Sequence, residues 1–307
     1  MKKVLIATEK PFAKEAVDSI KEIAKDVGYE IVLLEKYTEK SQLLKAVADV
    51  DGMIIRSDNA DKEVLDAAKN LKVVVRAGAG FDNIDLEAAT KNNIVAMNTP
   101  GQNSNAVAEL AFGMMLFTAR GGFDGKSGSE LREKTLGIHA YGNVGKYVAE
   151  IAKGFNMKVF AFDPFVKDSD IAADGVTPVK SVEDLYKNCQ YVSLHIPAND
   201  KTRNSINKDL LSLMPKDGVL INTARKEVIH EEDLLSLMEA RPDFKYLSDI
   251  APDCAATITE KYPSRSLFTP KKMGAQTSEA NINAGIAAIN QIINFIEKGD
   301  ATFKVNK

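Results

Sequence analysis

Short runs of β-branched and other apolar residues alternate with amphipathic helical patterns along almost all of this 307-residue chain. Strands joined by helical crossovers are typical of a parallel sheet that helices cover on both faces. Strands are expected at 3–7, 30–34, 52–55, 73–76 and 94–97, with helices at 11–27 and 62–70. The chain is therefore expected to begin with a compact α/β unit that ends near residue 98.

A second α/β series begins near Lys134, after a helix expected at 104–120 and a glycine-rich surface loop at 121–128. Its strands are expected at 136–140, 158–163, 191–195, 219–222 and 246–250. A last helix is expected at 279–298, and the first unit would be natural for it to cover. Its expected apolar face consists of Ile282, Ile286, Ile289, Ile293 and Ile296.

The composition argues against several classes of protein. The net charge is −3 and the pI is about 5.8, so neither nucleic acid nor an anionic membrane is an expected partner. Cys189 and Cys254 lie far apart, which argues against a disulfide framework or a zinc site. No run approaches the roughly 20 apolar residues of a membrane span. We expect a cytoplasmic protein without a metal centre.

The residues Ala140-Tyr141-Gly142-Asn143-Val144-Gly145 follow an expected strand and open an expected helix. They match the dinucleotide fingerprint G-x-G-x-x-G, except that Ala140 replaces the first glycine. A helix N-terminus offers backbone N–H groups to a pyrophosphate, and a side chain at Gly142 would block that approach. Gly145 allows the helix to pack closely on its strand. A glycine turn that binds no nucleotide is the alternative interpretation.

Asp163 ends the next expected strand, and no Arg or Lys follows it directly. A carboxylate at this position can accept hydrogen bonds from both hydroxyls of the adenosine ribose, which favours NAD over its 2′-phosphorylated form. NAD is therefore the predicted cofactor. The alternative is that Asp163 is a solvated acid at the end of a strand.

Five further stretches stand in one order along the chain and carry a family resemblance. They are Val75 to Asp85 (VRAGAGFDNID), Met97 to Ser104 (MNTPGQNS), Val107 to Leu110 (VAEL), Ser193 to Pro197 (SLHIP) and Ile221 to Arg225 (INTAR). On these residues the chain resembles the D-2-hydroxyacid dehydrogenase family over essentially its whole length. The resemblance implies two Rossmann-like or flavodoxin-like parallel-sheet domains with an active-site cleft between them, and a homodimer. Residues 1–98 with 277–307 would bind the substrate, and residues 99–276 would bind NAD.

The resemblance also implies roles for individual residues. Arg225 should bind the substrate carboxylate and polarise the C2 oxygen through its planar, two-pronged guanidinium. Asp249 should hold the nicotinamide carboxamide, and His195 is interpreted as structural or cofactor-adjacent. Other positions that match cofactor-lining residues of the family are Ala79, Asn143, Val144, Ile196, Thr223 and Ala224. Substrate-binding positions are the backbone at Ala79 and Gly80, with Asn103 nearby.

Arg56 and Ser57 follow an expected strand and match the phosphoglycerate-oxidising members of the family. One cation and one hydroxyl at the end of a strand suit a phosphate group. The pair is therefore predicted to bind a substrate phosphate. The alternative is a surface arginine engaged in a salt bridge.

One loop departs from the family pattern, because Lys272 stands where the acid/base His is usual. The partner Glu of that His is also missing near Cys254, and Asp253 is the nearest acid. Lysine has an ordinary pKa of about 10.4, so it accepts a proton near neutrality only if burial or Arg225 lowers that pKa. We therefore expect a pH optimum for alcohol oxidation above neutrality. Lys271 is the alternative proton carrier, and a solvated charged loop is the alternative for both lysines.

The reaction that these residues favour is the NAD-dependent oxidation of 3-phospho-D-glycerate to 3-phosphohydroxypyruvate, the entry step to serine. Hydride would leave C2, and Lys272 would take the hydroxyl proton. Two alternatives stay open. One is another 2-ketoacid reductase of the family, acting on hydroxypyruvate, glyoxylate or pyruvate in the manner of a D-lactate dehydrogenase. The other is a dinucleotide-sensing, corepressor-like protein without catalysis.

Overall fold

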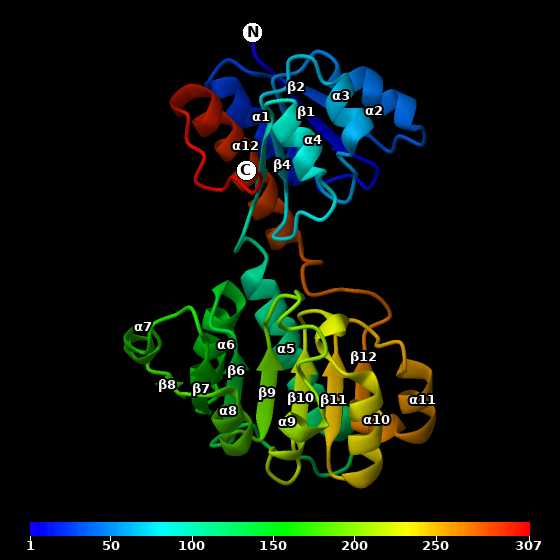
Figure 1. Cartoon of the computed structure of the whole chain (residues 1–307), viewed down its shortest axis with the longest axis vertical. Coiled ribbons are helices and arrows are strands. Elements are labelled where there is room, and N and C mark those ends of the chain that lie inside the picture. The colour runs from blue at the N-terminus through cyan, green and yellow to red at the C-terminus, as the bar shows by residue number, and fades with distance from the viewer. The chain divides into compact units, whose positions relative to one another are not determined.

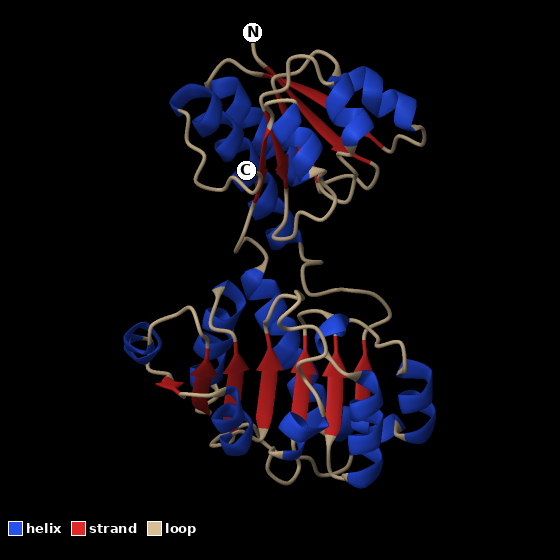
Figure 2. Cartoon of the chain, in the orientation of Figure 1, coloured by secondary structure: helices blue, strands red, loops and turns tan.

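The computed structural model describes residues 1–307, which divide into two compact units. Residues 1–103 and 277–307 form the first unit, and residues 104–276 form the second. Each unit is a parallel sheet with helices on both faces (Figures 1 and 2). The predicted fold class of two parallel-sheet α/β units is confirmed.

The sheet of the first unit has five parallel strands in the order β2-β1-β3-β4-β5, which is the flavodoxin-like order. Its strands are β1 (Lys3–Thr8), β2 (Glu30–Glu35), β3 (Gly52–Ile55), β4 (Val73–Arg76) and β5 (Val95–Asn98). Its helices are α1 (Lys14–Asp26), α2 (Lys40–Val47), α3 (Lys62–Ala67), α4 (Leu86–Lys91) and α12 (Ser278–Lys298).

Alternate residues of these strands point to opposite faces and build two cores. Leu5 and Met53 pack with α2, α3 and α4 on one face, while Val4 and Ile54 pack with α1 and α12 on the other. The last helix thus covers the first unit, as predicted. Of its expected isoleucine face, Ile289 is fully buried, and Ile282, Ile293 and Ile296 are partly buried against this core. The other buried side chains of the helix are Ala280, Ala284, Ala288, Gln291 and Ile292. A Cβ on Gly52 would lie 2.7 Å from Ile292 Cγ2, so the helix lies close to the sheet at this strand.

The sheet of the second unit has seven parallel strands in the order β12-β11-β10-β9-β6-β7-β8. Its strands are β6 (Thr135–His139), β7 (Lys158–Phe162), β8 (Thr177–Pro178), β9 (Tyr191–Leu194), β10 (Val219–Asn222), β11 (Lys245–Ser248) and β12 (Ser266–Phe268). Its α-helices are α5 (Ser104–Ala119), α6 (Asn143–Gly154), α7 (Asp168–Ala173), α8 (Val182–Asn188), α9 (Lys208–Ser212), α10 (Glu231–Ala240) and α11 (Ala255–Lys261). Short 3₁₀ turns lie at Gly121–Phe123, Lys226–Val228 and Pro263–Arg265.

The strand order of the second unit reverses between β6 and β9, as in a Rossmann fold. One face of the sheet packs on α5, α6 and α7, and the other packs on α8 to α11. The two edge strands, β8 and β12, escaped prediction because they are too short to show a periodic pattern. None of the helices is both long and apolar enough to span a membrane.

Candidate active site

The dinucleotide turn lies between β6 and α6, at the carboxyl edge of the second unit's sheet. Gly142 is the N-cap of α6, and a Cβ added to it would meet no atom within 4 Å. A Cβ on Gly145 would instead lie 2.5 Å from the carbonyl oxygen of Ala140. The space at Gly142 and the free N–H groups of the helix start therefore fit a pyrophosphate, while Gly145 serves the close packing of helix on strand.

Ala140 adopts a left-handed conformation with φ of 81°, which a glycine adopts without strain. This conformation costs a residue with a Cβ roughly 1–2 kcal/mol, which a glycine at this position would not have to spend. Glycine is also freer in the unfolded chain, which reduces the stability gained by the substitution by about 0.5–1 kcal/mol. We expect Ala140→Gly to raise the free energy of unfolding by about 0.5–1 kcal/mol in chemical denaturation. Ala149→Gly, within α6, is the matched control and should lower it by about 1 kcal/mol. A loss of stability in Ala140→Gly would contradict the strain.

Asp163 follows β7 directly and lies beside the dinucleotide turn. Its carboxylate accepts hydrogen bonds from the backbone N–H groups of Tyr141 at 2.8 Å, Phe165 at 2.8 Å and Val166 at 3.3 Å. A carboxylate offers about four lone-pair positions, so Asp163 keeps capacity for a further donor. The acid therefore holds the turn in place and remains able to accept a ribose hydroxyl.

His139 and His195 end β6 and follow β9 respectively, next to each other at the same edge, with the backbone N–H of His195 donating to the carbonyl of His139 at 2.9 Å. Burial lowers the pKa of His139 to about 4. Burial, together with the neighbouring His139, lowers the pKa of His195 to about 3. His195 Nε2 is buried without a hydrogen-bond partner. Both imidazoles are therefore neutral near pH 7, which agrees with a structural role for His195.

The two lowered pKa values predict acid sensitivity. In the unfolded chain both histidines bind protons below about pH 6.5, whereas the folded protein takes them up only near pH 4 or below. The free energy of unfolding should therefore fall as the pH drops from about 6.5 to about 4. The denaturant concentration at the midpoint of unfolding should fall when the pH is lowered from about 7.5 to about 5. We expect this fall to be smaller in His195→Gln than in the unmodified protein. His230→Gln, at a partly exposed position, is the control, and an unchanged pH profile in His195→Gln would contradict the prediction.

Arg225 and Lys272 converge on one carbonyl group at the same sheet edge. The guanidinium Nη1 of Arg225 donates to the carbonyl oxygen of Ala224 at 2.9 Å, and Nζ of Lys272 donates to that oxygen at 3.4 Å. Asn222 shapes the turn that carries Arg225, because its amide donates to the Arg225 carbonyl at 2.9 Å and accepts from the Ala224 N–H at 3.0 Å. The structure thus brings the two predicted catalytic cations together. Lys271 makes no such contact.

Asp249 follows β11 and holds the loop that carries Lys272. Its fully buried carboxylate accepts from the N–H groups of Met273 at 2.7 Å and Gly274 at 2.8 Å, and from the hydroxyl of Thr269 at 3.0 Å. A role as the anchor of this loop was not anticipated from the sequence. The only sequence signal was an acid at the end of a strand, which does not name the groups that the acid contacts.

The neighbourhood of Cys254 is also organised by acids that the sequence did not single out. Both carboxylate oxygens of Glu231 accept backbone N–H groups, from Asp253 and from Cys254, at 2.8 Å each. Asp253 pairs with Lys226 at 2.5 Å. Burial and the contact with Glu231 raise the pKa of the Cys254 thiol to about 12. These acids support the loop.

The other cofactor positions in the second unit lie at the carboxyl ends of its strands. Asn143 and Val144 begin α6, Ile196 lies two residues beyond β9, and Thr223 and Ala224 follow β10. Parallel strands bring these ends to one edge, which explains why residues so far apart in sequence lie along it.

The predicted substrate residues of the first unit lie at the carboxyl edge of its own sheet. Arg56 and Ser57 follow β3, and Ala79 and Gly80 follow β4. The Asn98 amide donates to the Ala79 carbonyl at 2.6 Å, and Arg76 donates to the Gly80 carbonyl at 3.1 Å, so this loop is held from both sides. Asn103 lies in the turn before α5.

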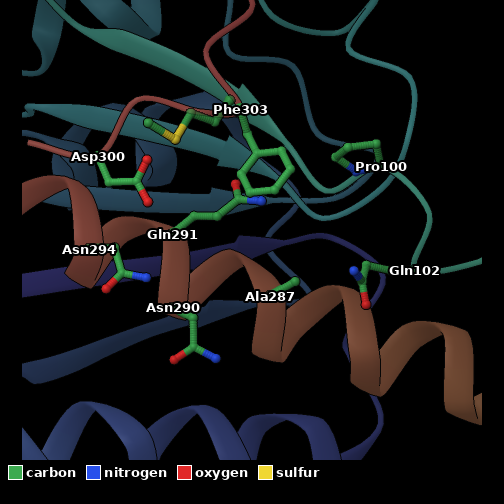
Figure 3. Close-up of a pocket in the computed structure, with 9 residues that line it drawn as sticks. Pro100, Gln102, Ala287, Asn290, Gln291, Asn294, Asp300 and Phe303 are labelled. Carbon is green, nitrogen blue, oxygen red and sulfur yellow. The ribbon is translucent and has the colours of Figure 1, made fainter.

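A separate cavity of about 200 Å³ lies in the first unit between α12 and the C-terminal tail (Figure 3). Gln291 is 8% exposed, and its Oε1 is buried there without a hydrogen-bond partner. The figure shows its amide next to the ring of Phe303. The full lining is Met97, Pro100, Gln102, Ala287, Asn290, Gln291, Asn294, Asp300 and Phe303. None of the predicted cofactor or substrate residues lines this cavity.

Comparison with known proteins gives the class of protein. Residues 113–260 match the model of the "D-isomer specific 2-hydroxyacid dehydrogenase, NAD binding domain". A hydroxypyruvate reductase of Thermotoga maritima is 34% identical over 281 residues, which cover 86% of this chain and 90% of that protein. The chain belongs to the D-isomer specific 2-hydroxyacid dehydrogenase family, and it is an NAD-dependent oxidoreductase. The predicted family, enzyme class and cofactor are confirmed.

Two further relatives are phosphoglycerate dehydrogenases. The solved structure of the NAD⁺-bound 3-phosphoglycerate dehydrogenase of Entamoeba histolytica is 46% identical, with a TM-score of 0.87, and the match covers 100% of this chain and 99% of that one. The D-3-phosphoglycerate dehydrogenase of Methanocaldococcus jannaschii is 34% identical over 298 residues. That match covers 90% of this chain and 55% of the relative, so the chain spans about half the length of that protein.

Proposed function

We propose that the protein oxidises 3-phospho-D-glycerate to 3-phosphohydroxypyruvate with NAD, the entry step to serine, and that Lys272 is its acid/base residue. The observation that carries the proposal is the convergence of Arg225 and Lys272 on the Ala224 carbonyl. A carboxylate-binding guanidinium and a proton carrier have to lie next to each other, because the carboxyl group and the C2 hydroxyl of the substrate are on adjacent carbons. The 46% identical phosphoglycerate dehydrogenase supports the choice of substrate.

In this proposal each cation has a separate task. Arg225 binds the substrate carboxylate and orients C2. Lys272 takes the proton of the C2 hydroxyl during oxidation and returns it during reduction. NAD, when bound, supplies the hydride acceptor. Gly142, the helix start at Asn143 and Asp163 position it, with Ala79, Gly80 and Asn103 contributing to the substrate side.

Arg56 is the residue proposed to recognise the phosphate. It is half-buried at the end of β3, and it makes no salt bridge, contrary to the alternative of a surface ion pair. Burial lowers the pKa of its guanidinium, which nevertheless stays charged. A half-buried cation without an acidic partner is stabilised by a bound anion, and the hydroxyl of Ser57 would add one neutral donor.

Steady-state NADH consumption with 3-phosphohydroxypyruvate, hydroxypyruvate, glyoxylate and pyruvate tests the proposal. We expect the highest kcat/KM with 3-phosphohydroxypyruvate. Arg56→Gln should raise the KM for that substrate by about 10- to 100-fold, since a charge-assisted hydrogen bond contributes about 1.5–3 kcal/mol. The same variant should leave the KM for hydroxypyruvate within about twofold of the original value.

A hydroxypyruvate reductase is the second candidate, favoured by the Thermotoga maritima relative. It would be supported by a higher kcat/KM for hydroxypyruvate and by an Arg56→Gln variant that affects both substrates equally.

We also propose that the protein is a homodimer, as the family resemblance implies. Light scattering that returns the mass of one chain would contradict it.

A further inference from the structure

We propose that Asn281 is a positioning residue that aims the Arg56 guanidinium at the substrate phosphate without pairing its positive charge with a carboxylate. The inference rests on the proposed function. It concerns a residue of α12 that lies 225 positions from Arg56 in sequence and that no motif singled out.

The Arg56 guanidinium is held entirely by neutral groups. Its Nη2 donates to Oδ1 of Asn281 at 2.5 Å, and its Nη1 donates to the carbonyl of Pro11 at 3.4 Å. Its central carbon lies 5.0 Å from the centre of the Phe12 ring. These contacts fix the direction of the planar group, and none of them cancels its charge.

The acid Asp58 lies near Arg56 but forms no ion pair with its guanidinium. The carboxylate of Asp58 accepts hydrogen bonds from the Glu9 N–H at 2.7 Å and from the Tyr37 hydroxyl at 2.8 Å. Its contact with Arg56 is to the backbone N–H, at 3.5 Å, and its charge acts on the guanidinium only through space. The N–H groups of the guanidinium are therefore not taken by a carboxylate and can meet an anion that arrives from outside.

The amide of Asn281 has its orientation determined from both ends. Its Nδ2 donates to the carbonyl of Thr277 at 2.8 Å, so its Oδ1 is the atom that faces Arg56. Thr277 is itself the N-cap of α12, and its hydroxyl accepts from the Ala280 N–H at 3.1 Å. The start of the helix therefore presents a neutral acceptor to the guanidinium at a defined place.

A neutral acceptor and a carboxylate would have opposite effects at this position. A carboxylate would form a charge-assisted pair with Arg56 and compete with the substrate phosphate for the same guanidinium. It would also suit the first turns of α12, where a negative charge is favourable. Asn281→Asp should therefore weaken the recognition of the phosphorylated substrate selectively. The variant also loses the donor to the Thr277 carbonyl, but a purely structural effect of that loss would affect both substrates alike.

The experiment compares Asn281→Asp and Asn281→Ala with the unmodified enzyme. We expect Asn281→Asp to raise the KM for 3-phosphohydroxypyruvate by about tenfold or more, with the KM for hydroxypyruvate within about twofold. Asn281→Ala should raise the first KM less, because the charge of Arg56 stays available. Asn283→Asp adds the same charge at an exposed position of α12 and should change neither KM by more than about twofold.

Two results would overturn the inference. One is an Asn281→Asp variant with an unchanged KM for 3-phosphohydroxypyruvate. The other is an equal rise of both KM values together with a lower melting temperature, which would assign Asn281 a structural role. Failure of the proposed function is seen separately, in the unmodified enzyme. If that enzyme does not prefer the phosphorylated substrate, the phosphate site and the inference fall together before any variant is made.

Discussion

Replacing Lys272 by Met is expected to lower kcat by about 10²- to 10⁴-fold, the usual contribution of general acid–base catalysis. Met keeps the length and most of the volume of the side chain but can neither donate nor accept the proton of the C2 hydroxyl. The measurement is steady-state turnover in both directions. Binding of NAD should be unchanged, since Lys272 is proposed to contact only the substrate.

Two companion variants sharpen the test of Lys272. Lys271→Met alters the adjacent lysine, which is exposed like Lys272 but makes no hydrogen bond or ion pair, and should retain nearly full activity. Lys272→Arg keeps the positive charge but holds its proton at all accessible pH values, so it should stay as inactive as Lys272→Met. Full turnover in Lys272→Met would refute the assignment. Recovery in Lys272→Arg would show that charge, not proton transfer, is what the position supplies.

Removing the carboxylate of Asp249 is expected to affect stability and catalysis together. Asp249→Ala leaves the N–H groups of Met273 and Gly274 without their acceptor, at a cost of about 2–4 kcal/mol, while the hydroxyl of Thr269 keeps the backbone carbonyl of residue 249. For a unit of this size the melting temperature should fall by about 5–10 °C. Because the released loop carries Lys272, kcat should fall at least about tenfold.

Asp253→Ala is the matched control for Asp249. Its side chain is 79% exposed and its pair with Lys226 is a surface salt bridge, which contributes about 0–1 kcal/mol. It should therefore change both the melting temperature and kcat little. If Asp249→Ala changed only the KM for NAD, or left kcat intact, the loop anchor would not matter for catalysis.

The sequence alone determined the class of fold and the places where function gathers. Alternation of strand and helix patterns requires parallel sheets, and parallel strands bring their carboxyl ends to one edge. Arg56 and Arg225 follow predicted strands, and Asp163 and Asp249 lie at the carboxyl ends of two others, so their positions at these edges could be predicted from local pattern alone. Two short edge strands could not, because a run of two or three residues carries no periodicity.

Only the tertiary structure decided which side chains meet. Lys272 reaches the carbonyl beside Arg225 across 48 positions of sequence, and Asn281 reaches Arg56 across 225. Asp249 proved to hold the loop of Lys272, a partner that its place after a strand did not reveal. Such contacts depend on how distant segments pack and on the direction of each side chain. Local sequence patterns record neither of these, because periodicity reports only which face of an element is buried.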